Sequence, residues 1–145
     1  MDETMTQWLC ARRLAAGLSA VCLWSTPGAN AADQYLFDVL KNKTYLSSWN
    51  TLIASQPDAP DWLKAYGRTK NGPATPAEPV TAGGKTYEVG MVCKTHACGG
   101  NRFFVTFVDR GRKAYGLLLQ GEQRSFYGSP EPEVSEALKK AANLP

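Results

Sequence analysis

The sequence predicts an α+β fold, with an antiparallel sheet of about five strands and flanking helices in a single domain. Apolar residues recur at helical spacing over 35–53 and alternate with polar residues over 85–93. Residues 101–109 are dense in aromatic and β-branched side chains, and turn residues separate them from two further strand-like runs, 113–120 and 123–128, as in an antiparallel meander. Helical character returns over 129–145. This order of helix, meander and helix is the basis of the prediction.

The first residues have the features of a secretory signal peptide. Arg12 and Arg13 precede an apolar run over 14–24, and Ala29 and Ala31 follow with the small-x-small spacing of a cleavage site. The apolar run is about half as long as a helix that spans a bilayer. We therefore expect this leader to be removed on export.

On this interpretation residues 1–31 are the signal peptide and residues 32–145 are the mature domain. A buried N-terminal helix is disfavoured by the order of basic pair, apolar run and small residues. A lipid anchor at Cys22 is disfavoured because Val21 is bulky where a small residue is needed. No other apolar segment is long enough to span a membrane, so we expect no membrane anchor.

The length and composition of the chain limit the classes of function that it can have. The mature chain of about 114 residues is long enough for one hydrophobic core. A formal net charge of +3 is too weak to indicate nucleic-acid binding. The short basic run over 110–113 is typical of a solvated turn. We expect no nucleic-acid partner and no cofactor.

The helical part of the mature chain begins near residue 35. Its apolar pattern continues to Ile53 with a break at Asn42, and Asp61 is expected to cap a short helix anchored by Trp62. The proline-rich segment 67–80 is expected to be an extended surface connection.

Four strands are expected next, over residues 85–93, 101–109, 113–120 and 123–128. Tight turns at 109–112 and 121–122 join the last three. In the final helix, prolines lie near the first turn and Lys139 and Lys140 in the last, as the helix dipole prefers.

A loop between the first two of these strands is the candidate site. It contains His96, the only histidine of the chain, between Cys93 and Cys98. Once Cys10 and Cys22 leave with the signal peptide, two cysteines remain in an oxidising compartment, which indicates a disulfide. The bridge would enclose four residues in a tight, protruding loop: Lys94, Thr95, His96 and Ala97.

Several functions of this loop can be weighed from its residues. A zinc site is disfavoured because the mature chain lacks a fourth cysteine or histidine ligand. Thiol redox chemistry is disfavoured because the spacing is C-x4-C between strands. Catalysis is disfavoured because no nucleophile motif or paired acid accompanies the histidine. Two interpretations remain open, a structural disulfide beside an uninvolved histidine and a rigid plug for a cleft in another protein.

The sequence resembles the Ivy family, inhibitors of vertebrate lysozyme found in the periplasm of Gram-negative bacteria. The family's loop has the form C-K-P-H-D-C, and here it stands as C-K-T-H-A-C over residues 93–98, followed by Gly99 and, three residues later, Arg102. The similarity extends over residues 50–127, including the "TPA" and "GKTYEV" segments and the later "AYGLL".

The resemblance implies a non-enzymatic inhibitor of c-type lysozyme in the periplasm. Its loop would enter the active-site cleft, where His96 would meet the catalytic carboxylates. Cys93 and Cys98 would brace the loop, and Lys94 would be a flanking contact. The resemblance also allows a homodimer.

Two loop residues depart from the family pattern, since Thr95 replaces its proline and Ala97 its aspartate. Both changes predict a softer and less charged loop. Lysozymes of this type are basic, so a chain of net charge +3 gains no long-range attraction to them. A second hypothesis is therefore a periplasmic binding module of the same fold with another partner. An enzyme or redox protein is the third.

Overall fold

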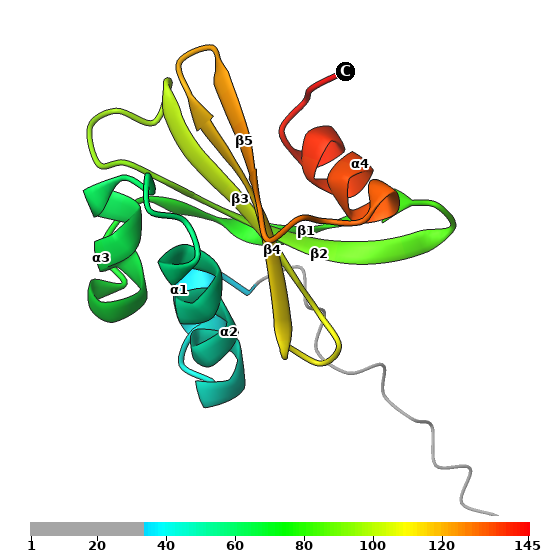
Figure 1. Ribbon diagram of the computed structural model, residues 1–145, viewed down its shortest axis with the longest axis horizontal. Helices are drawn as coiled ribbons and strands as arrows, with labels where there is room; N and C mark the ends of the chain where they lie inside the picture. The colour runs from blue at the N-terminus through cyan, green and yellow to red at the C-terminus, as the bar shows by residue number, and fades with distance from the viewer. Residues whose placement is uncertain (1–33) are drawn as a thin grey trace, which may run out of the picture.

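The computed structural model describes residues 34–145, and the expected signal peptide lies outside them. The order of elements is three helices, five strands and a final helix (Figure 1). They are α1 (Leu36–Val39), α2 (Lys43–Ala54), α3 (Asp61–Thr69), β1 (Ala74–Ala82), β2 (Lys85–Cys93), β3 (Asn101–Val108), β4 (Lys113–Gln120), β5 (Gln123–Tyr127) and α4 (Pro132–Ala141). The predicted α+β class is confirmed.

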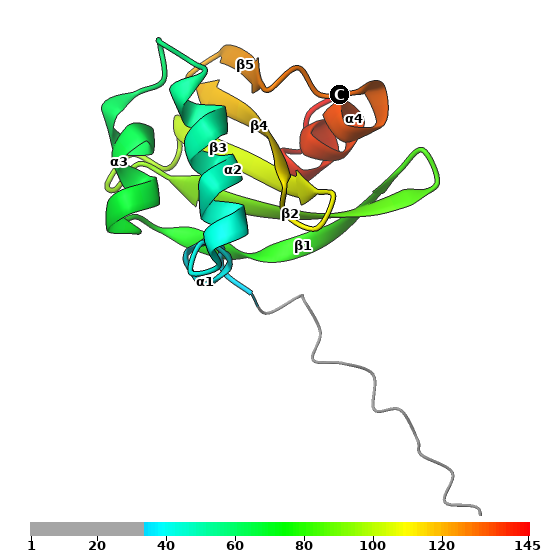
Figure 2. The same cartoon turned by 60° about the horizontal axis from the view of Figure 1, so that its bottom comes forward.

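The strands form one open antiparallel sheet in the order β1-β2-β3-β4-β5. Helices α1, α2 and α3 lie over one face and α4 lies over the other (Figures 1 and 2). Because every neighbouring pair is antiparallel and adjacent in sequence, short turns join the strands. The β2–β3 connection is the exception, and it carries the disulfide loop.

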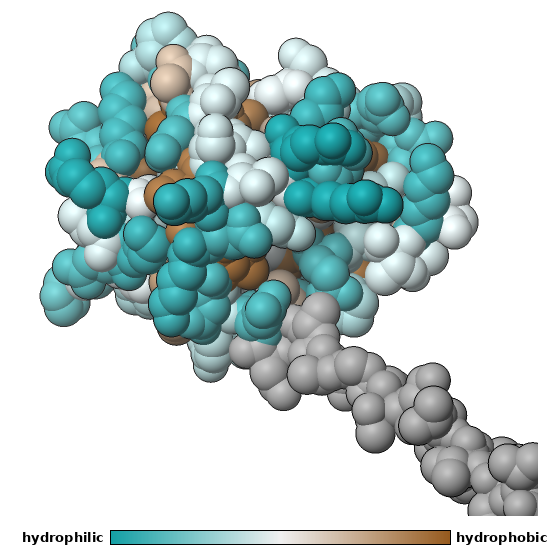
Figure 3. Space-filling model, turned by 90° about the horizontal axis from the view of Figure 1, so that it is seen from below, coloured by the Kyte–Doolittle hydropathy of each residue, from teal (hydrophilic) through white to brown (hydrophobic). Residues whose placement is uncertain are grey.

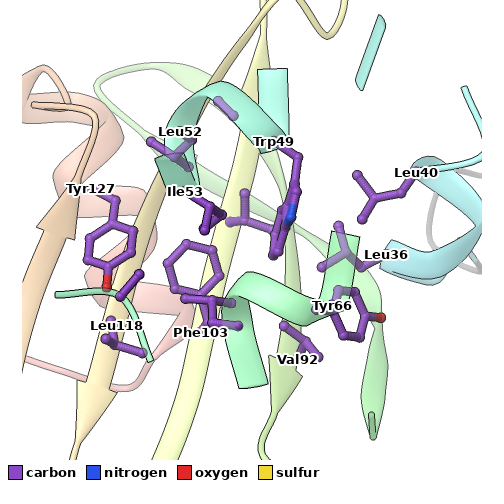
Figure 4. Close-up of a cluster of buried hydrophobic side chains, with 14 residues drawn as sticks. Leu36, Leu40, Trp49, Leu52, Ile53, Tyr66, Val92, Phe103, Leu118 and Tyr127 are labelled. Carbon is purple, nitrogen blue, oxygen red and sulfur yellow. The ribbon is translucent and has the colours of Figure 1, made fainter. Parts of the chain in front are cut away.

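Both faces of the sheet are buried, because successive side chains along each strand point to opposite sides. Phe103 packs beneath the N-terminal helices, with its ring centroid 5.5 Å from that of Trp49 and 5.3 Å from that of Tyr127 (Figure 4). The next residue, Phe104, joins the cluster beneath α4 with Leu117. The strand stem of the disulfide loop is therefore held between two apolar clusters.

The helix boundaries follow local chemistry. The Asn42 side chain accepts a hydrogen bond of 2.9 Å from the Thr44 backbone and starts α2, which agrees with the predicted break. Pro132 occupies the first turn of α4. The prediction that Asp61 caps α3 is wrong, because Pro60 is the N-cap and Asp61 is the first helical residue.

The proline-rich segment is the larger correction, since much of it forms strand β1 and not a surface connection. Pro79 lies opposite Glu88 of β2, and the register shifts between Thr75 and Glu78. Proline has no backbone N–H to donate to a neighbouring strand. An inner strand has hydrogen-bonded neighbours on both sides, whereas an edge strand tolerates proline where the missing N–H would face away from the sheet. The strand β1 is at the edge, which explains why its composition resembles a loop.

Seen from below, this side of the molecule is mainly hydrophilic, with apolar surface visible in the hollows between polar side chains (Figure 3). Within residues 34–145, no helix combines the length and apolar character needed to cross a membrane.

Candidate functional site

The β2–β3 hairpin positions the disulfide loop. Cys93 is the last residue of β2 and lies opposite Arg102 of β3. Beyond this pair, the Lys94 N–H donates to the Asn101 carbonyl across 3.1 Å. The loop therefore begins from a hydrogen-bonded stem, and the whole connection between β2 and β3 is seven residues long, 94–100.

The predicted bridge between Cys93 and Cys98 is present, with the two Cα atoms 5.0 Å apart. The Cys93 side is buried, with 3% of the residue exposed, whereas Cys98 is half-buried. One end of the bridge is thus anchored in the sheet, and the other holds the returning arm of the loop.

The tip of the loop is a tight turn. The Ala97 N–H donates to the Lys94 carbonyl across 2.9 Å, so Thr95 and His96 are the central residues. His96 has φ of 62°, in the left-handed region that costs a non-glycine residue about 1 kcal/mol. Lys94, Thr95 and His96 are all exposed, and His96 is one of the two central residues of the turn.

The returning arm is fixed through one carbonyl. The Ala97 oxygen accepts hydrogen bonds from Gly100 N–H at 3.3 Å, Asn101 N–H at 3.1 Å and Asn101 Nδ2 at 3.4 Å. These contacts involve the Ala97 backbone and not its side chain. The returning arm is therefore held through the backbone of Ala97.

Two other connections support the base of the loop. The Cys93 N–H donates to the Pro73 carbonyl, which lies in the α3–β1 connection, across 3.0 Å. On the other side, the Gly121 N–H in the β4–β5 turn donates to the Gly100 carbonyl across 2.8 Å. The sequence prediction missed both contacts, because backbone hydrogen bonds between distant segments leave no side-chain pattern.

The arrangement suits contact with another molecule. Among residues 34–145, no group of three or more His, Cys, Asp or Glu side chains is placed to hold a metal ion. His96 makes no side-chain hydrogen bond or ion pair in that part of the chain, so no partner there orients it as a catalytic base. An exposed imidazole on a braced loop, with no hydrogen-bond partner among residues 34–145, is available to another molecule.

A groove of about 730 Å³ lies elsewhere, between α1 and the sheet. Leu36, Val105 and Phe107 are among the residues that line it, and none of the lining residues belongs to the disulfide loop. The loop therefore does not border this groove, and its exposed residues project from the fold.

Comparison with known proteins supports the resemblance. The family model described as "Inhibitor of vertebrate lysozyme (Ivy)" matches residues 47–143, which include the whole loop. A protein of Pseudomonas aeruginosa named "Inhibitor of vertebrate lysozyme" is 27% identical over 143 residues, covering 89% of this chain and 91% of the relative. An Escherichia coli protein of the same name is 31% identical over 93 residues, covering 64% of this chain and 55% of the relative.

Proposed function

From the premise that the chain belongs to the Ivy family, the inhibitors of vertebrate lysozyme, we propose that it inhibits c-type lysozyme by inserting its disulfide loop into the active-site cleft. The family role is non-enzymatic. The observation that carries the proposal is the exposed His96 at the corner of a loop closed by the bridge between Cys93 and Cys98.

The chemistry of the imidazole matches such a cleft. A retaining glycosidase places a protonated carboxylic acid and a carboxylate about 5 Å apart on either side of the scissile bond. A neutral imidazole has one N–H donor and one nitrogen acceptor. His96 can therefore donate to the carboxylate and accept from the acid at the same time. The ring would also occupy the space of the sugar.

The neighbouring loop residues fit this placement. The ammonium of Lys94 is exposed next to the tip and suits the negative charge of a cleft lined by carboxylates. Thr95 and Ala97 are small enough for the loop to enter a narrow opening. Because the bridge and the backbone hydrogen bonds order the loop before binding, association loses little conformational entropy.

We place the protein in the periplasm. The proposed signal peptide over residues 1–31 supports export, and a structural bridge such as that between Cys93 and Cys98 is typical of an oxidising compartment. Fractionation of cells that produce the full chain tests this placement. Recovery of the chain, shortened to residues 32–145, in the periplasmic fraction is the expected result, and an uncleaved cytoplasmic chain would contradict it.

The inhibition itself is tested by lysis of Gram-positive cells with a c-type lysozyme and the purified mature protein. We expect the wild type to block lysis and His96→Ala to lose most of the effect. Lys94→Ala should weaken inhibition, whereas Lys85→Ala should not, because both lysines are exposed but Lys85 begins β2 and Lys94 follows its last residue. Unimpaired lysis at micromolar excess of wild-type protein would refute the proposal.

A second candidate is a periplasmic binding module of the same fold with another protein partner. The replacement of the family's proline and aspartate by Thr95 and Ala97, together with the net charge of +3, favours it. The lysis assay separates the two candidates, since this module would leave lysozyme fully active.

A further inference from the structure

The disulfide loop does not stand alone at its end of the sheet. In an antiparallel meander, alternate connections emerge at the same end. The β2–β3 loop, the β4–β5 turn and the α3–β1 connection therefore meet there (Figure 1). The bond from Gly121 N–H to the Gly100 carbonyl joins the loop directly to the β4–β5 turn. A partner that receives the loop must also face this turn.

The surface between loop and turn is open. A Cβ atom built on Gly99 or on Gly121 would have no heavy atom within 4 Å, and one on Gly100 would meet only the Gly121 nitrogen at 4.0 Å. No side chain from elsewhere in the described chain covers this strip. The surface of a partner can therefore reach the backbone between the loop tip and Glu122, the next residue of the turn.

The charges at this end are unequal. Lys94 and Arg124 are exposed, and Lys70 is half-exposed. Glu122 is the single carboxylate in the three segments 70–73, 94–100 and 120–124, and it is exposed. It takes part in none of the three ion pairs within residues 34–145. Its charge is therefore not neutralised by a salt bridge in that part of the chain.

Resting on the proposed function, we propose that the recognition surface extends from His96 across Gly99 to Glu122, and that Glu122 contacts a lysine or arginine at the rim of the lysozyme cleft. The loop, with Lys94 and His96, meets the carboxylates inside the cleft. The remaining surface of the enzyme is basic, so an acidic side chain of the inhibitor is complementary to it. Because the loop has Ala97 and not an acid, Glu122 supplies that contact from the adjacent turn.

The test is the dissociation constant of the mature protein for a c-type lysozyme, measured by titration calorimetry. Glu122→Gln should raise Kd about two- to five-fold at low salt, and the difference should shrink in about 0.5 M salt. Glu88→Gln is the matched control, because it changes net charge equally but lies on β2 roughly 17 Å before the loop. Its Kd should equal that of the wild type.

Gly99→Leu tests the same surface by steric means. Gly99 is not among the glycines with positive φ, and its Cβ position is open, so the variant should fold with an unchanged melting temperature. The added side chain should nevertheless obstruct the partner and raise Kd about tenfold or more.

The outcomes separate this inference from the proposed function. Lysozyme binding that His96→Ala weakens but that Glu122→Gln and Gly99→Leu leave unchanged overturns the extended surface and keeps the inserted loop. No binding by the wild type overturns both. An equal loss in Glu122→Gln and Glu88→Gln would also overturn the inference, because net charge and not a local contact would then be responsible.

Discussion

Removing the disulfide should reduce both the affinity for lysozyme and the free energy of unfolding, and the length of the loop gives the size of each loss. The bridge joins residues five positions apart. In the chain-entropy model, cross-linking such a short loop stabilises the folded state by about 2 kcal/mol. The double variant Cys93→Ala/Cys98→Ala should therefore lose about 2 kcal/mol in free energy of unfolding. Part of any further loss would come from the cavity at Cys93, which is buried.

The effect on inhibition has a different origin. Without the bridge, the four enclosed residues must be ordered on binding, at up to about 1–2 kcal/mol of backbone entropy each. The Lys94–Ala97 turn and the hydrogen bonds to the Ala97 carbonyl remain and should hold part of the loop. We therefore expect an inhibition constant about tenfold higher, which corresponds to about 1.4 kcal/mol.

Urea denaturation and inhibition titrations measure the two quantities separately. Wild-type protein treated with a reductant is the control for unfolding, because it retains both sulfur atoms and leaves no cavity. Inhibition is compared without reductant, so that the enzyme is not exposed to it. Equal stability and equal inhibition in the wild type and the double variant would refute the view that the bridge holds the loop ready for binding.

Three further predictions concern the scaffold. Gly116→Ala should destabilise the fold by about 1–3 kcal/mol in urea denaturation, because its Cβ would lie 2.2 Å from the Phe103 ring in the core; wild-type stability would contradict this packing. Asn42→Ala should cost about 1 kcal/mol through loss of the α2 cap, and an unchanged melting temperature would argue against the cap. Burial, and secondarily the charge of Asp38, raises the pKa of the Tyr66 hydroxyl from 10.0 to about 12. Between these two pH values the unfolded chain loses the hydroxyl proton while the folded chain keeps it, so the free energy of unfolding should fall as the pH rises from 10 to 12. Tyr66→Phe should flatten that fall in denaturation curves measured across this range, and an unaltered slope would contradict the assignment.

Much of the fold follows from the residue pattern, and the exceptions have a common cause. Alternation predicted β2, an aromatic and β-branched run predicted β3, and an apolar run between two turns predicted β4, because their side chains fill the two cores. The edge strand β1 was missed because Pro76 and Pro79 mark it as a loop. Edge position is a property of the assembled sheet, so a local pattern cannot reveal it.

In the candidate site, too, some features could be predicted from the residue pattern and others depend on the assembled fold. Its bridge could be predicted from the cysteine count and the expected export. The contributions of Pro73, Asn101 and Gly121 to the base of the loop could not, since they act through backbone groups or an ordinary amide side chain. The resemblance to a family directs attention to residues 93–98, whereas the hydrogen bonds show that two neighbouring connections hold the base of this loop.

The two departures from the family loop should have unequal effects. Thr95 is the second residue of the tip turn, and the third residue, His96, has positive φ. In turns of this kind proline is favoured at the second position, which Thr95 occupies. The Thr95 N–H donates none of the loop's backbone hydrogen bonds in the described chain. Thr95→Pro should therefore fold normally and change inhibition less than about threefold, because the bridge already restrains the loop.

Ala97→Asp should act through charge. The Ala97 carbonyl, and not its side chain, holds the returning arm, so an aspartate should leave the loop conformation unchanged. It adds an acid beside a basic enzyme and should lower the inhibition constant about two- to fivefold at low salt. Lysis assays on both single variants decide the matter. A large gain from Thr95→Pro with none from Ala97→Asp would mean that the loop of this chain is soft, and that its backbone hydrogen bonds do not hold it as we infer.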